Sequence, residues 1–156
     1  MRYLLILLLT TSMWAQDHHF KAARKEVTWT MTYQLPEGDV MKLLPKNNKK
    51  LIVNEGEFTG RGVKFNCTCK EGSWYFEQAF DLQFEITLVE GGYSVTVSDI
   101  TFEGEGENNA NNRLENYVLR IGQSVFHTTK KNITNLICLD AYLENVFKVP
   151  GASVVK

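Results

Sequence analysis

The fold is decided by residues 80–102, which read FDLQFEITLVEGGYSVTVSDITF. Apolar and mostly polar residues alternate along both halves of this stretch, as they do in a strand with one buried face. The pair Gly91-Gly92 separates the halves, and glycine accepts the positive φ that a two-residue hairpin turn requires. The pattern therefore predicts two antiparallel strands joined by a tight turn at Gly91-Gly92.

This turn also predicts a register for the hairpin. It places Leu88 opposite Val95 and Ile86 opposite Val97, so that the apolar residues of both strands share one face of a sheet. The alternation slips after Val97, which predicts a β-bulge near Ser98-Asp99.

Three further strands are predicted before the hairpin. Residues 26–34 (EVTWTMTYQ) alternate in the same way, and residues 51–53 and 63–65 are short strands joined by a turn near residues 59–62. Between the first two, Asp39 to Leu44 is predicted as one helical turn that Asp39 caps and Pro45 ends.

After the hairpin, apolar residues recur with the period of a helix. Two helices are predicted, over residues 114–125 and 132–147, the second capped by Asn132. The first is expected to bury Leu114, Tyr117, Val118, Ile121 and Val125, and the second Ile133, Leu136, Ile137, Leu143, Val146 and Phe147. Residues 26–149 are thus predicted to form one α+β domain, an antiparallel β-sheet of about five strands with the C-terminal helices packed on one face.

The N-terminus has the layout of a secretory signal peptide. Met1-Arg2 is followed by the apolar run Tyr3 to Leu9 and a more polar stretch to Ala15, with cleavage predicted before Gln16. The apolar run is shorter than the about 20 residues that a membrane-spanning helix needs. We expect a secreted or periplasmic protein; a retained N-terminal anchor is the alternative.

Two polar segments flank the predicted domain. Residues 16–25 are expected to be a flexible lead-in, in which His18 and His19 are exposed to solvent, and residues 150–156 a C-terminal tail.

The charge of the chain is balanced. It has 17 basic and 18 acidic side chains, and loss of Arg2 with the signal peptide leaves 16 against 18, a formal charge of -2. A nucleic-acid binder needs a basic surface that neutralises phosphates, so no nucleic acid is expected as a partner. No apolar run after Leu9 approaches membrane-spanning length, so no membrane insertion is expected after signal cleavage.

The hairpin stretch, together with Gly56 to Val63 (GEFTGRGV) and the Ala15-Gln16 junction, resembles a known family. The family is that of secreted Bacteroidetes proteins called the domain of unknown function 4468, and the resemblance covers roughly Val27 to Phe102. It implies a TATA-box-binding-protein-like fold and export, and no catalytic or ligand residues, since none are established for the family. The family usually has a longer helix with a Trp between its first two strands, where Pro36, Gly38 and Pro45 leave room here for only a stub.

Three cysteines, Cys67, Cys69 and Cys138, are too few for a disulfide scaffold. Cys67 and Cys69 are predicted on one face of a strand, and a bridge from Cys138 to either of them is sterically open. The favoured interpretation is three small buried hydrophobic residues. A zinc site of the three thiolates and His127 is the weaker alternative.

Other signals of chemistry are weak. Glu103, Glu105 and Glu107 offer oxygens to calcium but lack the EF-hand spacing, so a solvated acidic loop is favoured. A nucleophile activated by a base would need His127 as that base. The favoured interpretation is that His127 lies near a helix end, where a cationic imidazole interacts favourably with the helix dipole. No catalytic, cofactor-binding or metal-binding residues are therefore expected, and no cofactor.

The segment Trp74-Tyr75-Phe76 is the one candidate binding surface. Core packing at the start of a strand is its favoured interpretation, and an exposed aromatic contact for a partner or a glycan is the alternative.

The sequence thus predicts an exported, non-enzymatic domain that binds an unknown protein or envelope component through its sheet or the loop around Trp74. The alternative is a secreted hydrolase or metal-dependent enzyme using His127 and the thiols of Cys67, Cys69 and Cys138.

The first prediction concerns export. Protein recovered from the periplasm or medium should begin at Gln16 on N-terminal sequencing, because signal peptidase cleaves after a small residue such as Ala15. Membrane-bound protein that retains Met1 would show an anchor instead.

Overall fold

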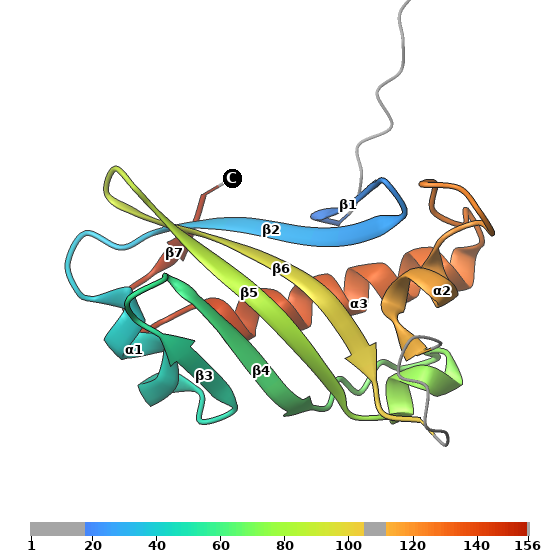
Figure 1. Ribbon diagram of the computed structural model, residues 1–156, viewed down its shortest axis with the longest axis horizontal. Helices are drawn as coiled ribbons and strands as arrows, with labels where there is room; N and C mark the ends of the chain where they lie inside the picture. Colours follow the sequence, from blue (N-terminus) through green and yellow to red (C-terminus); the bar gives the residue numbers. More distant parts are fainter. Residues whose placement is uncertain (1–17, 105–111, 156) are drawn as a thin grey trace, which may run out of the picture.

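The structure, a computed structural model, describes residues 18–104 and 112–155 and shows an α+β domain (Figure 1). Its seven-stranded antiparallel sheet has the order β1-β2-β6-β5-β4-β3, with β7 also paired to β2. The elements are β1 (Phe20–Ala23), β2 (Glu26–Gln34), α1 (Val40–Asn47), β3 (Leu51–Asn54), β4 (Thr59–Phe65), η1 (Trp74–Glu77), β5 (Phe80–Val89), β6 (Gly92–Phe102), α2 (Leu114–Val118), α3 (Lys130–Phe147) and β7 (Ser153–Val154). The α+β class is confirmed, and the sheet exceeds the expected five strands.

The two additional strands lie in the segments predicted as a lead-in and a tail, so those two predictions are corrected. β1 and β7 pair with opposite ends of β2, on the edge that β6 does not occupy. The β1–β2 turn is made by Arg24 and Lys25, both at positive φ, which glycine usually occupies. Pairing both ends of this edge removes exposed backbone groups that invite aggregation.

The hairpin of β5 and β6 has the predicted buried face in a different register, except that Leu88, which was expected on this face, is 58% exposed. Leu88 lies opposite Tyr93 and Ile86 opposite Val95, so the turn residues are Glu90 and Gly91. The shift amounts to two residues, and a shift of two keeps each side chain on its own face. Ile86 is therefore buried as predicted.

The backbone explains where the hairpin departs from simple alternation. Gly91 has a φ of +70°, as a turn residue needs, whereas glycine is required at position 92 because of a close backbone contact. A Cβ at Gly92 would lie 1.9 Å from the backbone oxygen of Tyr33, so only glycine allows β2 to approach here. The predicted bulge is confirmed, since the register shifts there and Asp99 has a φ of +51°.

The turn between β3 and β4 lies at residues 55–58 and not near residues 59–62 as predicted. The glycines that suggested the later turn belong to β4. A Cβ at Gly60 would lie 2.3 Å from the ring of Phe84, and one at Gly62 would lie 2.1 Å from the ring of Phe65. These glycines make room for aromatic rings in the core.

Three helix boundaries also differ from the prediction. Asp39 caps α1 by accepting a hydrogen bond from the Met41 amide, as expected, but the helix continues past Pro45 to Asn47. A proline in the last turn removes only one backbone hydrogen bond. The predicted helix over residues 114–125 ends at Val118, and α3 is capped by Thr129 and not by Asn132.

The shortened α2 exposes residues that were expected in the core. After Val118 the chain forms a small antiparallel loop, in which Leu119 bridges to Phe126 and Gly122 turns at a φ of +72°. Ile121 is consequently 99% exposed, and Val125 is exposed as well. Helical spacing alone did not reveal that Gly122 ends the pattern.

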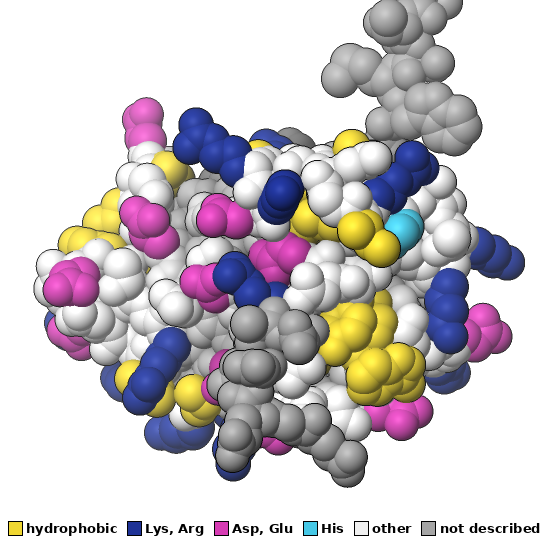
Figure 2. Space-filling view, turned by 45° about the vertical axis from the view of Figure 1, so that its right-hand side comes forward, with side chains coloured by type: hydrophobic (Ala, Val, Ile, Leu, Met, Phe, Trp, Pro, Cys, Tyr) yellow, Lys and Arg dark blue, Asp and Glu magenta, His cyan; other side chains and the backbone are white. Residues whose placement is uncertain are grey.

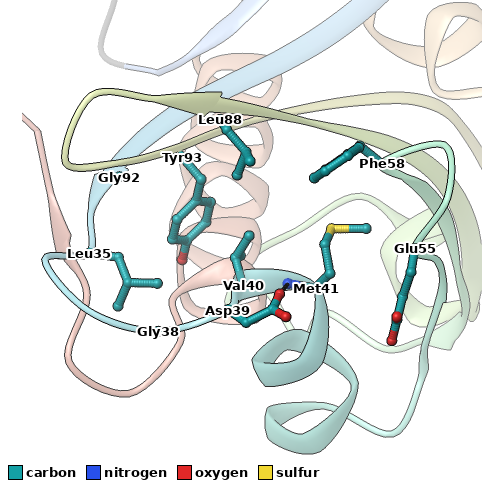
Figure 3. Close-up of a pocket in the computed structure, with 10 residues that line it drawn as sticks. All are labelled: Leu35, Gly38, Asp39, Val40, Met41, Glu55, Phe58, Leu88, Gly92 and Tyr93. Atoms are coloured by element: carbon teal, nitrogen blue, oxygen red, sulfur yellow. Dashed lines mark hydrogen bonds between the residues drawn. The ribbon is translucent and has the colours of Figure 1, made fainter.

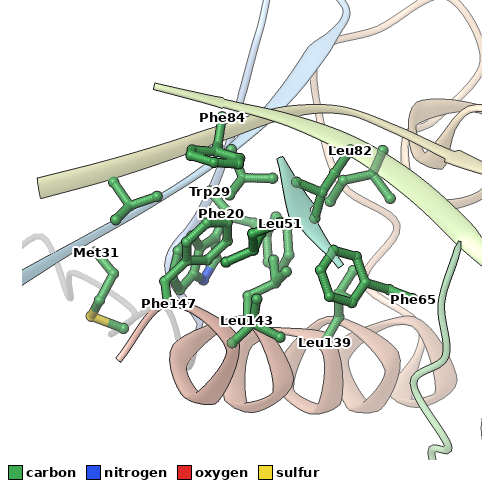
Figure 4. Packing of buried hydrophobic residues seen from close by; sticks show 14 of the residues in the cluster. Phe20, Trp29, Met31, Leu51, Phe65, Leu82, Phe84, Leu139, Leu143 and Phe147 are labelled. Atoms are coloured by element: carbon green, nitrogen blue, oxygen red, sulfur yellow. The ribbon is translucent and has the colours of Figure 1, made fainter. Parts of the chain in front are cut away.

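The core lies between one face of the sheet and α3 (Figures 1 and 4). Phe147 of α3 packs against the rings of Trp29 and Phe84, and Leu139 and Leu143 lie along the same helix face. Of the predicted helix face, Ile133 and Ile137 are exposed, because α3 buries polar residues in their place.

One of these polar residues, Asp140, connects the lead-in histidine His19 to the core. Its carboxylate accepts hydrogen bonds from Trp29 Nε1 at 2.7 Å and from the His19 backbone amide at 2.9 Å. The His19 ring lies beside the same carboxylate, at 3.0 Å, and the His18 ring packs edge-on against Phe20. Both histidines are thus part of the fold, although His19 is exposed to solvent as predicted and His18 is half-buried.

The second prediction tests the close approach at Gly92. Gly92→Ala should destabilise the domain by roughly 1–3 kcal/mol, because the methyl group must displace backbone, not a flexible side chain. Urea denaturation followed by circular dichroism measures the change. Gly56→Ala is the matched control, since nothing lies within 4 Å of its added Cβ. Equal stability of the two variants would contradict the register described here.

Candidate functional site

The predicted surface segment is only partly on the surface. Trp74, Tyr75 and Phe76 form η1, a 3-10 helix between β4 and β5, and not the start of a strand as expected. Trp74 is 65% exposed, whereas Tyr75 and Phe76 are buried. The expected binding surface is thereby reduced to one indole ring.

This indole is supported by two tyrosines. The rings of Tyr75 and Tyr117 stack with centroids 4.3 Å apart, and Trp74 meets Tyr117 edge-on at 5.9 Å and Tyr75 at 6.2 Å. Tyr75 in turn packs against Phe102 of β6. We call Trp74, Tyr75 and Tyr117 the aromatic platform; its base is continuous with the core, so the exposed indole is held in place.

Asn135 of α3 joins η1 to the helix. Its side-chain amide nitrogen donates to the Ser73 hydroxyl at 2.7 Å and to the Tyr75 hydroxyl at 3.0 Å, and its oxygen accepts from the Ser73 amide. Burial raises the pKa of Tyr75, so its phenol stays protonated at neutral pH. The sequence analysis did not single out Asn135. An asparagine on the predicted buried face of a helix is the signal that could have found it, because a buried amide needs hydrogen-bond partners.

A pocket of about 270 Å³ opens beside the platform. Its lining includes Ser73, Tyr75, Tyr117, His127, Lys131 and Asn135. Figure 2 shows hydrophobic side chains gathered at the surface on the right, at the end of the molecule that carries η1 and α2, with lysine and arginine side chains nearby. The site therefore combines an exposed aromatic ring with hydrogen-bonding groups.

His127 lies in this pocket and not at a helix end as predicted. It follows the loop after α2 and precedes α3, where its backbone amide donates to the Val118 carbonyl. Within residues 18–104 and 112–155, no hydrogen bond joins its ring to a carboxylate or to Ser73. The Ser73 hydroxyl belongs instead to the network of Asn135 and Tyr75. The pocket thus brings a serine and a histidine together without the contacts of a catalytic pair.

The three cysteines do gather, and two of them are bonded. Cys69 and Cys138 form a disulfide with a Cα–Cα separation of 6.0 Å, while Cys67 is a buried free thiol. This corrects the expectation of three plain hydrophobic residues, and Cys67 and Cys69 lie in a loop after β4 and not in a strand. Among the described residues, His127 is not part of the sulfur group, so the hypothetical zinc set is not assembled.

The acidic loop is described only in part. Glu103 is exposed just after β6, as a solvated loop predicts. Glu105 and Glu107 lie outside the described residues.

A second concavity, the α1 cleft, lies at the opposite end of the sheet (Figure 3). It has a volume of about 390 Å³, and Phe58 and Leu88 face Val40 and Met41 of α1 across it. Phe58 is strained, with a φ of +53°. At the mouth, Asp39 is already engaged as the helix cap and as an ion-pair partner of Lys42, which holds the pKa of that carboxyl below its usual range.

The chain matches no family model, no curated protein and no solved structure. In the part of the chain that the structure describes, no helix is long and apolar enough to cross a membrane. The resemblance to the domain of unknown function 4468 stays a prediction, and the sites rest on their geometry.

The third prediction concerns metal. Protein purified without reductant should hold less than about one-tenth zinc per chain, because a disulfide removes two of the three thiolates that zinc would need. Elemental analysis measures this, with Cys67→Ala as the control that should change nothing. Stoichiometric zinc that disappears in Cys67→Ala would overturn the assignment.

Proposed function

We propose that this protein is an exported, non-enzymatic binding module and that its ligand docks on the aromatic platform. The observation that carries the proposal is an indole that is 65% exposed and yet braced by two stacked tyrosines. Tryptophan and tyrosine are enriched at the energetic centres of binding surfaces. A braced ring also loses little conformational freedom when a ligand packs against it.

The surroundings of Trp74 favour a ligand that carries sugar rings. A pyranose ring presents C–H groups on one face, which pack on an indole, and hydroxyl groups around its rim. The adjoining pocket supplies an imidazole from His127 and an exposed ammonium from Lys131. These groups match the hydroxyls of a saccharide better than they match a purely apolar ligand. A glycan of the cell envelope fits both this chemistry and the predicted export.

The α1 cleft is the main competitor for this role. It is larger and more enclosed by apolar side chains, as small-molecule sites usually are. Its lining holds the carboxylates of Asp39, which is occupied within α1, and Glu55, whereas the platform pocket holds Lys131, and neither Glu55 nor Lys131 forms an ion pair within the described residues. The platform is favoured because its polar groups lie beside an indole that is 65% exposed, whereas of the two rings at the cleft Phe58 is 38% exposed and Tyr93 is buried.

The enzyme alternative receives less support. A hydrolase built on His127 needs a nucleophile in contact with the imidazole and a third group that orients it. The described contacts of Ser73 run to Asn135 instead, and two of the three thiols are consumed in the disulfide. Burial raises the pKa of the remaining thiol, Cys67, to about 11, so it is a weak nucleophile at neutral pH.

The family resemblance belongs to the same proposal. One antiparallel sheet with a long helix along one face agrees with a TATA-box-binding-protein-like fold, and the secreted family of that resemblance suits an exported binding module. The balanced charge argues against nucleic acid as the ligand.

The fourth prediction tests the platform. Wild-type mature protein is screened on an array of bacterial surface glycans, and the affinity for the best-binding oligosaccharide is measured by titration calorimetry. Trp74→Ala should weaken binding at least about fivefold, because truncation of a central aromatic contact typically costs more than about 1 kcal/mol.

Leu88→Ala is the matched control, since Leu88 is also an exposed apolar side chain, 58% exposed, but lies at the α1 cleft. Its affinity should stay within about twofold of wild type. Loss of binding in Leu88→Ala and not in Trp74→Ala would move the site to the α1 cleft. Absence of any glycan binding by wild-type protein would contradict the ligand class.

A further inference from the structure

The sulfur cluster of Cys67, Cys69 and Cys138 holds one thiol against one disulfide. The Cys67 sulfur lies 3.4 Å from the Cys69 sulfur and 3.8 Å from the Cys138 sulfur. Both distances are close to van der Waals contact. The Cys67 sulfur thus lies beside the S–S bond, close enough that rotation of the cysteine side chains can bring it into line with that bond for attack, as thiol–disulfide exchange requires.

We propose that the cluster exchanges between two pairings, Cys69–Cys138 and Cys67–Cys138, so that the free thiol alternates between Cys67 and Cys69. The thiolate of Cys67 attacks the Cys138 sulfur, a Cys67–Cys138 bond forms and the Cys69–Cys138 bond breaks. Cys69 leaves as the thiolate and takes up the proton that Cys67 released. No external oxidant or reductant is consumed, because the number of disulfides does not change.

Attack on Cys138 is favoured over attack on Cys69 by the geometry of the product. A Cys67–Cys69 bridge would close a small ring with only one residue between the two cysteines, and so small a ring strains the disulfide geometry. A Cys67–Cys138 bridge joins the same loop to the same helix as the disulfide that the structure shows. It needs little backbone movement, since all three sulfurs already lie within 4.8 Å of one another.

Exchange changes which cysteine carries the free thiol and which residue of the loop is covalently bonded to α3. Cys67 is buried, whereas Cys69 is partly exposed, so the exchanged form presents a more accessible thiol. It also moves the covalent anchor from Cys69 to a point farther from Trp74 along the loop that leads into η1. The hydrogen bonds of Asn135 then still hold the aromatic platform, but the chain between the disulfide and the platform is longer than in the form that the structure shows. The exchange itself does not depend on the proposed function.

The rate of exchange should depend strongly on pH. Burial raises the pKa of Cys67 to about 11, and only the thiolate attacks. Tyr142 of α3 is the titratable side chain whose charge interacts with Cys67, and burial raises its pKa as well, so it stays protonated as the pH rises. Below the pKa of Cys67, the thiolate fraction increases tenfold per pH unit. Exchange should thus be about a hundredfold faster at pH 9 than at pH 7.

The fifth prediction tests the exchange by locating the free thiol. Mature protein purified at pH 5 is incubated at pH 7, 8 and 9, then denatured at pH 5 with N-ethylmaleimide, and the alkylated cysteine is identified by peptide mass spectrometry. Alkylated Cys69 should accumulate about tenfold faster for each pH unit. Alkylation confined to Cys67 at every pH would overturn the proposal.

Two variants test the exchange even if the equilibrium between the two pairings strongly favours Cys69–Cys138, because each variant allows only one of the pairings with Cys138. Cys69→Ser, refolded with oxidised glutathione, should form the Cys67–Cys138 disulfide and keep the near-ultraviolet circular dichroism of wild type. Cys67→Ser should keep Cys69–Cys138 and show no alkylation in the pH series. A folded Cys69→Ser protein that retains two free thiols would refute the exchange. An unfolded Cys69→Ser protein would refute it too, because the exchanged form must be native-like.

Discussion

The structure depends on three polar side chains buried on α3. Asp140 accepts from Trp29 and His19, Asn135 binds η1, and Asn132 donates to the carbonyls of Val118 and His127. Each would lose about 1–3 kcal/mol of hydrogen bonding if left unsatisfied in the core. A purely apolar helix can slide or rotate on a sheet, whereas these contacts allow one position only. The helix is thereby fixed against the residue that precedes β1, against β2 and against two connections at once.

This arrangement explains why the candidate site lies where it does. Asn135 and Cys138 are three residues apart on α3, so they lie on neighbouring positions of the same helix surface. Asn135 holds Ser73 and Tyr75, and Cys138 holds Cys69, so the connection between β4 and β5 is attached to α3 at two points. That connection ends in η1, and Trp74 is exposed because its neighbours in sequence are drawn into the core. Rigid support and exposure thus have the same cause.

Elements with a strong local pattern were predictable. The strand over residues 26–34 and the buried face of the hairpin follow from alternation over many residues, which no helix reproduces. The cap at Asp39 follows from its own side-chain chemistry. Several predictions that failed concern short segments: β7 has two residues, β1 has four, and the apolar spacing after Val118 continued by chance beyond the true end of α2. The hairpin register failed for another reason, because Gly92 is required by the close approach of β2 and not by the turn. Such segments take their structure from the partner they meet.

The sequence by itself determined the class of the fold and the face of each long strand, because side-chain period and backbone geometry are linked within a single element. It also contained the aromatic segment at Trp74 and the three cysteines. Only the tertiary structure decided that one of three adjacent aromatic rings is exposed and which two cysteines are bonded. It alone brought His127 to the platform pocket and kept it from the sulfur cluster. These outcomes depend on distances between residues far apart in the chain, which the packing of α3 on the sheet sets and no local pattern encodes.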